Sequence, residues 1–300
     1  MKLGLPYKGS KNTIAEEIVS KLPPGHKILD ACCGGGAVLM ALAQSLKYDS
    51  VVGNDLNPAT IKLLDAVLIH KGQIDYEHPA PCSRNDFFVS LQKIENGDFD
   101  IQDCVNKFCA SFGNDGKTYL YGAQIEEYKL AAEQMLTAET LEQRRKFYRK
   151  FYSLINADNS EDKERLQKLE FMQRLQILER LERLERLDIF NIDYKEFDLV
   201  YFDIPYKGTN KYDFEFDYDR FYNLFESLKI PAFLSEYDAP FTCVAEFDKA
   251  QMMAAAVGST KSTTKEKLYF NGTKEEYKAL MGRNFDAKSE QMTLFLGSNL

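Results

Sequence analysis

The feature that most constrains the fold is an apolar run that ends in an acid and is followed by three glycines. Residues 26–31 are typical of a short buried strand, and the glycines at 34–36 lead from it into an apolar helical stretch over 38–46. A second short strand over 50–53 and a second helix over 58–70 repeat the pattern. Because parallel strands are joined by helical crossovers, this order predicts an α/β fold with a parallel sheet.

A second informative run lies far along the chain. Residues 198–203 predict another buried strand, and this strand ends in the tetrad Asp203-Ile204-Pro205-Tyr206. Ligands bind in open parallel sheets at the carboxyl ends of the strands. We therefore expect the glycine turn and the tetrad to lie side by side at one edge of the sheet. The segments predicted as further strands are 232–235, 242–246, 267–270 and 292–296, the last two in antiparallel orientation.

The middle of the chain breaks this alternation. Between residues 75 and 188 there is no regular succession of strand and helix. We expect residues 75–188 to form an inserted, mostly helical domain, and residues 1–74 and 189–300 to form the main domain together. Within the insertion, leucine or methionine recurs at every third position from 166 to 187. This spacing winds an apolar stripe around a helix, so we expect a helix that packs on more than one side.

Composition excludes several classes of protein. None of the six cysteines belongs to a C-x-x-C pair, and the three histidines have no zinc-finger spacing, so we expect free thiols and no metal site. No apolar stretch reaches the roughly 18 residues of a membrane helix, and a signal-peptide core is missing. We therefore expect a cytoplasmic protein that does not bind a membrane.

The charge of the chain bears on nucleic-acid binding. A net charge of −8 argues mildly against it, because proteins that bind a duplex are usually basic. A local basic face is enough, however, and residues 144–150 carry five basic side chains with two aromatic ones between them. Those residues predict either a face toward phosphates or an ordinary charged surface helix.

The glycine turn suits a ligand as well as packing. Glycines there allow a tight turn and a close approach of backbone to ligand, with Gly34 and Gly36 as the candidate contacts. Asp55 ends the next strand, where an acid commonly accepts hydrogen bonds from ribose hydroxyls; its alternative role is to cap the following helix. The glycines match neither the dinucleotide fingerprint nor a Walker sequence. A nucleoside cofactor without a phosphate chain, such as S-adenosylmethionine, is therefore favoured, and Asp30 would pair with its ammonium group.

The tetrad has the groups needed to activate a planar amine. Such an amine is a weak nucleophile, because its lone pair is delocalised into the ring. The Asp203 carboxylate and the backbone carbonyl of Ile204 would accept hydrogen bonds from its two N–H groups and free the lone pair. Pro205 stiffens the corner, and Tyr206 offers a ring on which a base stacks, worth about 1–3 kcal/mol. The alternative is a strand-ending turn with an aspartate cap and a packed tyrosine.

With both motifs in place, the chain resembles the Dam-like DNA adenine methyltransferases. The segments that carry the resemblance are 5–11, 30–38, 54–58, 191–194, 203–206, 235–237 and 265–268. The resemblance implies a Rossmann-like class I methyltransferase sheet, S-adenosylmethionine as cofactor, and an insertion that recognises the target in double-stranded DNA. It also implies that Tyr7, Lys11 and Asp193 contact the cofactor.

Two positions depart from the family pattern. The tetrad usually has proline at its second position, where this chain has Ile204, and residue 32 is usually aromatic, where this chain has Cys32. The carbonyl of residue 204 survives, so we expect adenine-N6 methylation of a base flipped out of the duplex. Methylation of cytosine or RNA is one alternative, and an inactive DNA-binding or cofactor-sensing remnant is another. We expect a monomer; the sequence leaves the recognised site open, as well as a phage or restriction-modification role.

Overall fold

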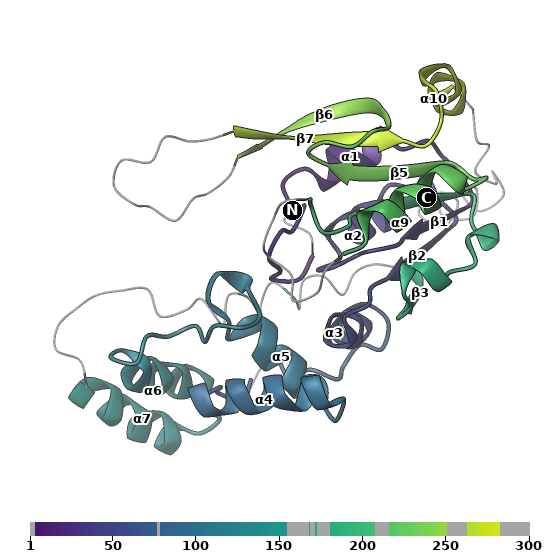
Figure 1. Ribbon diagram of the computed structural model, residues 1–300. Coiled ribbons are helices and arrows are strands. Elements are labelled where there is room, and N and C mark those ends of the chain that lie inside the picture. The colour runs from purple at the N-terminus through teal and green to yellow at the C-terminus, as the bar shows by residue number, and fades with distance from the viewer. Residues whose placement is uncertain are drawn as a thin grey trace, which may run out of the picture.

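The computed structural model describes residues 4–76, 79–154, 168, 172, 181–207, 216–250 and 263–282 of the 300-residue chain. Within these residues, seven strands form one sheet in the order β3-β2-β1-β4-β5-β7-β6 (Figure 1). They are β1 (Lys27–Asp30), β2 (Ser50–Asn54), β3 (Leu181–Glu185), β4 (Leu199–Phe202), β5 (Ala232–Glu236), β6 (Thr242–Ala250) and β7 (Thr263–Phe270). Neighbours from β3 to β5 run parallel, whereas β7 runs antiparallel to both β5 and β6.

The predicted alternation of strand and helix is confirmed. Helix α2 (Ala37–Gln44) joins β1 to β2, and helix α3 (Pro58–Leu68) follows β2. Proline suits the first turn of α3 because its missing amide proton would have no partner there, and the Asn57 side chain caps two other amides of that turn. β4 to β7 occupy the predicted segments, and the strand predicted over 292–296 lies outside the described residues. The expected α/β, Rossmann-like sheet is the one observed.

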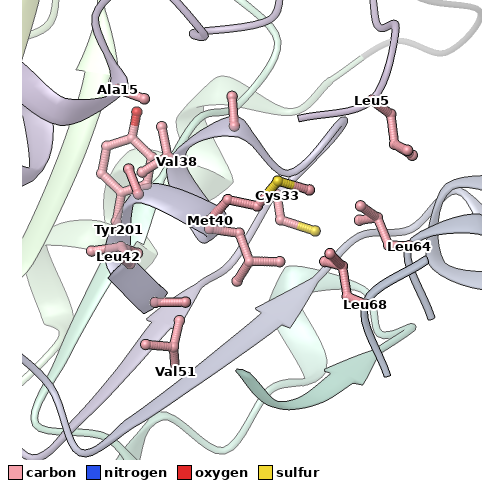
Figure 2. Packing of buried hydrophobic residues seen from close by; sticks show 14 of the residues in the cluster. Leu5, Ala15, Cys33, Val38, Met40, Leu42, Val51, Leu64, Leu68 and Tyr201 are labelled. Atoms are coloured by element: carbon pink, nitrogen blue, oxygen red, sulfur yellow. The ribbon is translucent and has the colours of Figure 1, made fainter. Parts of the chain in front are cut away.

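Apolar clusters cover both faces of the sheet. Along β4, Leu199 and Tyr201 belong to one cluster, and Val200 and Phe202 belong to the other. Figure 2 shows the first cluster, in which side chains of α2 and α3 pack with Val51 and Tyr201. Burial from both sides explains why these strands are apolar throughout instead of alternating between apolar and polar residues.

The remaining helices of the main domain flank these clusters. Helix α1 (Ala15–Ser20) packs into the first cluster, and Phe221 and Phe225 of α9 (Tyr218–Ser227) pack into the second. Helix α10 (Lys274–Met281) follows β7. Short 3-10 turns lie at Phe112–Asn114 (η1), Ile189–Asn191 (η3) and Tyr194–Glu196 (η4).

The edge strand β3 corrects the prediction for the leucine repeat. We expected a helix over 166–187, and this is wrong for Leu181–Glu185, which pairs with β2. Residues 173–180 lie outside the described residues. The sheet therefore resumes at residue 181, inside the segment 75–188 that the sequence assigned to the insertion.

A bulge explains why leucines three residues apart fit a strand. Val51 pairs with Leu181 and Val52 pairs with Arg183, so one extra residue of β3 lies between the two pairs. In a regular strand, side chains three residues apart point to opposite faces. With the bulge, Leu181 and Leu184 both pack against the first cluster.

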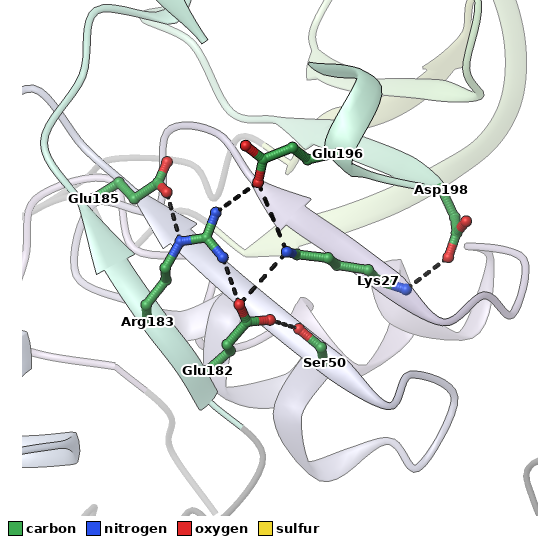
Figure 3. A network of polar contacts seen from close by, with 7 residues as sticks. All are labelled: Lys27, Ser50, Glu182, Arg183, Glu185, Glu196 and Asp198. Atoms are coloured by element: carbon green, nitrogen blue, oxygen red, sulfur yellow. Dashed lines mark hydrogen bonds and ion pairs between the residues drawn. The ribbon is translucent and has the colours of Figure 1, made fainter. Parts of the chain in front are cut away.

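Charged side chains fasten β3 to the sheet (Figure 3). Arg183 donates to Glu185 at 2.6 Å and to Glu196 at 3.0 Å, and it also pairs with Glu182. Lys27 Nζ of β1 lies 3.5 Å from Glu182 Oε1 and 3.8 Å from Glu196 Oε2. Each of these partly exposed ion pairs contributes only about 0–1 kcal/mol to the free energy of unfolding.

Between residues 79 and 154, within the segment predicted as an insertion, the described secondary structure is helical. The helices are α4 (Arg84–Asn96), α5 (Ile101–Cys109), α6 (Glu126–Thr137) and α7 (Leu141–Leu154), and Figure 1 shows them to one side of the sheet. Capping boxes at Ser83 and Asp100 begin α4 and α5. Cys104, Val105 and Phe108 of α5 belong to the first core cluster, so the insertion shares its core with the sheet.

Three global features bear on the sequence predictions. Each of the six cysteines is a free thiol. Among the described residues, no helix is both long enough and apolar enough to cross a membrane. The same residues contain no group of three or more histidine, cysteine or acidic side chains arranged to hold a metal ion.

Leu184→Ala is expected to lower the free energy of unfolding by about 2 kcal/mol, because it leaves a void in the first cluster. Leu187→Ala is the matched control: Leu187 is 41% exposed, and we expect a loss of about 0.5 kcal/mol or less. Urea unfolding followed by circular dichroism measures both. Equal losses at the two positions would contradict the bulged strand.

Candidate active site

The two motifs meet at the carboxyl ends of neighbouring strands. Asp30, the last residue of β1, pairs in register with Tyr201 of β4, and the Ala31 amide donates to the Tyr201 carbonyl at 2.9 Å. Asp203 follows directly after β4. The predicted juxtaposition of the glycine turn and the tetrad is thus what the structure shows. The chain continues outward from β1 through β2 to β3 and then returns to β4, so the site lies at the topological switch point of the sheet.

The glycine turn adopts a backbone that other residues rarely adopt. Gly34 and Gly36 have φ values of 47° and 80°. A Cβ on Gly36 would lie 3.0 Å from Leu64, and a Cβ on Gly35 would lie 2.6 Å from the Cβ of Tyr7. Glycine is therefore required both by conformation and by space. The turn leads into α2, whose N-cap position is Gly36.

The N-terminal segment lies across this turn. The Leu5 amide donates to the Gly35 carbonyl at 2.6 Å. The Tyr7 ring is 3.2 Å from the place of a Cβ on Gly34, and it stacks on Phe108 of α5 with centroids 6.1 Å apart. Tyr7 thus connects the predicted cofactor loop with the insertion.

Asp55 holds the glycine turn from β2. Its two carboxylate oxygens accept the amide N–H groups of Gly34 and Asn57, each at 2.8 Å. The cap of α3 is Asn57, so Asp55 does not have the capping role that the sequence left open. Burial raises the pKa of Asp55, the two amide bonds oppose this shift, and the charge of Asp203 adds to it.

A buried lysine pairs with the tetrad aspartate. Lys11 Nζ donates to both Asp203 oxygens, at 2.6 and 2.7 Å, and its side chain is 5% exposed. The same ammonium lies 3.5 Å from the fully buried Glu266 of β7 and 4.7 Å from the centroid of the Tyr206 ring. Lys11 was predicted as a cofactor contact; the structure places it against the tetrad.

Asp30 is a buried carboxylate in an unusual setting. It is 1% exposed, and within the described part of the chain neither of its side-chain oxygens has a hydrogen-bond partner. Burial, then the charges of Asp203 and Asp55, raise the pKa of Asp30 well above its ordinary value, and Lys11 and the nearby Cys32 amide lower it only in part. A buried acid without a partner is costly, so this oxygen pair is suited to a ligand that brings positive charge.

The rest of the tetrad is held rigidly. The Ile204 side chain is 1% exposed and packs in the second cluster, so only its carbonyl is available for chemistry. The Tyr218 hydroxyl of α9 donates to the Pro205 carbonyl at 3.0 Å. Tyr206 meets Tyr237 edge to face with centroids 4.6 Å apart. Burial raises the pKa of Tyr206 well above its ordinary value, and the charges of Asp203 and Glu266 add to this, so Tyr206 is a neutral ring.

Asp193 is the predicted site residue that the described contacts do not bring into this group. It is exposed, caps η4, and accepts the Lys195 amide at 3.2 Å. Two acids were not among the predicted site residues: Glu236, 1% exposed, and Glu266, 0% exposed. The signal was present, since both lie in segments that carried the family resemblance and both are charged residues inside strands.

A scan against protein-family models matches residues 7–269 to the D12 class N6 adenine-specific DNA methyltransferases. The chain belongs to this family. The family resemblance inferred from the motifs is thereby confirmed, and so is adenine in DNA as the target in preference to cytosine or RNA. The enzyme transfers a methyl group to the N6 amine of adenine in DNA.

The chain was also compared with solved structures and with curated protein sequences. A search of solved structures finds the rRNA methyltransferase aviRa from Streptomyces viridochromogenes at 13% identity, covering 86% of this chain and 84% of that one with a TM-score of 0.34. A search of curated protein sequences finds no match.

The buried ion pair can be measured by a double-mutant cycle. Lys11→Met and Asp203→Asn are each expected to destabilise the methyltransferase, and the cycle should give a coupling free energy of about 2 kcal/mol, because each single change leaves the other group in a site with little water. The control is Lys265→Met with Glu246→Gln, a pair 3.1 Å apart whose side chains are 61% and 47% exposed. We expect a coupling of about 0.5 kcal/mol there. Similar couplings in the two cycles would show that Lys11 is not desolvated as described.

Proposed function

We propose that the space between the glycine turn and the tetrad binds S-adenosylmethionine, and that a flipped adenine lies against Tyr206. The observation that carries the proposal is the pairing of β1 with β4, which brings the unpartnered carboxylate of Asp30 beside the Asp203 corner. The proposal includes a cytoplasmic monomer that acts on duplex DNA. The helices α4 to α7, which lie within the predicted insertion at 75–188, would contact the target.

The residues of the turn fit this cofactor. The site contains the acids Asp30, Asp55 and Asp203 and one lysine, Lys11, so it favours a cation and repels a pyrophosphate. Asp30 would pair with the ammonium group of the amino-acid moiety. Asp55 would accept hydrogen bonds from the ribose hydroxyls, through the oxygen lone pairs that are not used by its hydrogen bonds to the two backbone amides.

The remaining cofactor contacts follow the geometry of the turn. Gly34 and Gly36 give the turn its left-handed backbone, Tyr7 covers the turn, and we retain these three residues as cofactor contacts. Asp193 is retained as a contact to the adenine of the cofactor on the family resemblance alone. When bound, S-adenosylmethionine supplies an electrophilic methyl group on a sulfonium.

The tetrad acts on the target amine by accepting hydrogen bonds. The Asp203 carboxylate takes one N–H and the Ile204 carbonyl takes the other, which frees the nitrogen lone pair. Lys11 keeps Asp203 ionised and thus an acceptor, because a neighbouring cation favours the charged form. Tyr206 stacks on the base, and this contributes about 1–3 kcal/mol toward the few kcal/mol that flipping costs.

The basic face of α7 is the proposed contact to DNA phosphates. Arg145, Tyr148, Arg149 and Tyr152 lie three and four residues apart on one side of the helix, and all four are exposed. The two tyrosine rings stack with centroids 6.0 Å apart. In a protein with a net charge of −8, this helix collects five basic side chains and one acid. Phosphate neutralisation is the interaction that such a face supplies.

Asp203→Ala and Asp55→Ala are expected to impair different properties, the rate of methyl transfer and the binding of the cofactor. Asp203→Ala should reduce methyl transfer by about 10³-fold or more, with the dissociation constant of S-adenosylmethionine changed by less than about threefold. Asp55→Ala should weaken that binding about tenfold or more and slow transfer at saturation much less. Isothermal titration calorimetry and transfer of tritiated methyl groups to unmethylated duplex DNA measure the two quantities.

Nucleoside analysis of the labelled DNA identifies the methylated base. We expect label in N6-methyladenine. Label in methylcytosine, or binding of cofactor and DNA by the wild-type protein without any transfer, would sink the proposal. Comparable turnover by the Asp203→Ala protein would remove that carboxylate from the mechanism, and an unchanged dissociation constant would remove Asp55 from the cofactor site.

The double variant Arg145→Gln/Arg149→Gln is expected to reduce the slope of log binding constant against log salt by about 2, without changing which base is methylated. The matched control is Lys274→Gln/Lys278→Gln on α10, whose side chains are also exposed. DNA binding measured by fluorescence anisotropy from low to high salt gives the slopes. Equal slopes for the two variants would exclude α7 from the DNA interface.

A further inference from the structure

A buried glutamate joins the end of the tetrad to the neighbouring strand. Glu236 is the last residue of β5 and is 1% exposed. One of its carboxylate oxygens accepts the Lys207 amide at 3.1 Å, and the other accepts the Tyr237 amide at 2.7 Å. Since Lys207 directly follows Tyr206, this single carboxylate spans the ends of β4 and β5.

The two amides belong to residues that determine where the Tyr206 ring lies. The Tyr237 ring meets it edge to face, and Lys207 is its neighbour in the chain. The Tyr218 hydroxyl also donates to the Pro205 carbonyl. The tetrad is therefore held from β5 by Glu236 and from α9 by Tyr218.

We propose that Glu236 is a positioning residue of the methyl transfer, whose ionised carboxylate holds Tyr206 at the angle at which it stacks the flipped base. The inference rests on the proposed function, which gives Tyr206 this stacking role. A neutral side chain cannot replace the carboxylate, because a protonated carboxyl or an amide presents one acceptor oxygen and one donor, and one of the two amide bonds is lost.

A loosened segment has room to move. A hollow of about 510 Å³ adjoins the carboxylate and is lined by residues of the tetrad end, of α9 and of the turn after β5: Lys207, Tyr222, Glu236, Tyr237, Asp238, Ala239 and Pro240. Loss of the bond to the Lys207 amide would therefore shift the end of the tetrad instead of being prevented by packing.

The carboxyl of Glu236 titrates in the working range of pH. Burial raises the pKa of Glu236 to about 7, its two amide bonds oppose the shift, and Asp203 raises the pKa further while Lys11 lowers it. The other charged or titratable groups that face it come from the tetrad end, the turn after β5, β7 and α9: Lys207, Asp238, Lys267, Tyr218 and Tyr222.

Activity and stability then respond to pH with opposite signs. The folded-state pKa lies above the ordinary value of 4.5, so the contribution of Glu236 to stability is full below that pH and is lost as pH rises through about 7. Ionisation of Glu236 therefore lowers stability while it completes the hold on Tyr206. Protonation of Glu236 at low pH raises stability. If activity falls at low pH because Glu236 is protonated, loss of stability cannot be the reason.

Glu236→Gln tests the inference. Single-turnover transfer of tritiated methyl groups to unmethylated duplex DNA is measured with saturating cofactor from about pH 5.5 to about pH 9. At the upper end we expect the wild-type protein to be faster by about tenfold or more. At the lower end we expect rates within about twofold, because protonated glutamate and glutamine are both neutral and each has one carbonyl oxygen as its good acceptor. The midpoint of the change should lie near pH 7, as the pKa of about 7 requires.

Glu246→Gln is the matched control, because Glu246 is an exposed glutamate on β6 and its rates should equal those of the wild type at every pH. A ratio of wild-type to Glu236→Gln rates that does not change with pH would overturn the inference alone. No transfer by the wild-type protein would overturn the proposed function, and the inference with it.

A second measurement needs no DNA. Labelling with ¹³C-carbonyl tyrosine and ¹⁵N-lysine selects the amides of Tyr–Lys pairs, of which the chain has five: Lys8, Lys129, Lys195, Lys207 and Lys278. The Lys207 amide should shift with a midpoint near pH 7 in the wild type, and this shift should vanish in Glu236→Gln. A Lys207 amide that titrates identically in both proteins would refute the hydrogen bond on which the inference is built.

Discussion

The ion pair between Lys11 and Asp203 is the interaction on which the site depends. Asp203 lies among other acids, because its charge raises the pKa of both Asp30 and Asp55, and the buried Glu266 lies 3.5 Å from the lysine that pairs with it. A protonated Asp203 would lose acceptor capacity, which is the property that its proposed role requires. Lys11 donates to both of its oxygens and also lies near Glu266, so one cation from the N-terminal segment offsets the negative charge at the tetrad.

The topology of the sheet makes this arrangement possible. The chain runs outward from β1 to β3, returns, and continues outward on the other side from β4 to β5, so β1 and β4 are neighbours although they lie far apart in sequence. Their carboxyl ends carry the two motifs. The N-terminal segment then crosses the glycine turn: the Leu5 amide donates a hydrogen bond to the Gly35 carbonyl, and Tyr7 packs on the turn. The same segment brings Lys11 to Asp203. An acidic site is suited to a cationic cofactor, and the proposed contact to DNA phosphates lies elsewhere, on the basic helix α7.

The sequence predicted those features that depend on local patterns. Strands buried on both faces are apolar at successive positions, so β1, β2 and β4 could be predicted from the sequence. Three glycines between a strand and a helix indicate a tight turn, so the turn at 34–36 could be predicted as well. Tertiary contacts decided the rest. The leucine spacing in β3 fits a strand only because a bulge opposite Val51 and Val52 changes its register, and a bulge leaves no local signal. Asp55 and Asn57 were close enough in sequence for either to cap α3, and only the structure separates their roles. Glu236 and Glu266 lie in segments that carried the family resemblance, but their contacts with Lys207 and Lys11 join residues far apart in sequence and only the structure shows them.

A crystal structure with sinefungin, which carries an amine in place of the methylsulfonium, tests the central claim most directly. The claim is that the cofactor lies between the turn at 34–36 and the corner at 203–206. We predict its amino-acid ammonium at the Asp30 carboxylate, its ribose hydroxyls at Asp55, and its substituted amine pointing toward the Asp203 corner. Sinefungin bound at another place, or in this space with its ribose at Asp203 and its amino-acid end away from Asp30, would contradict the account.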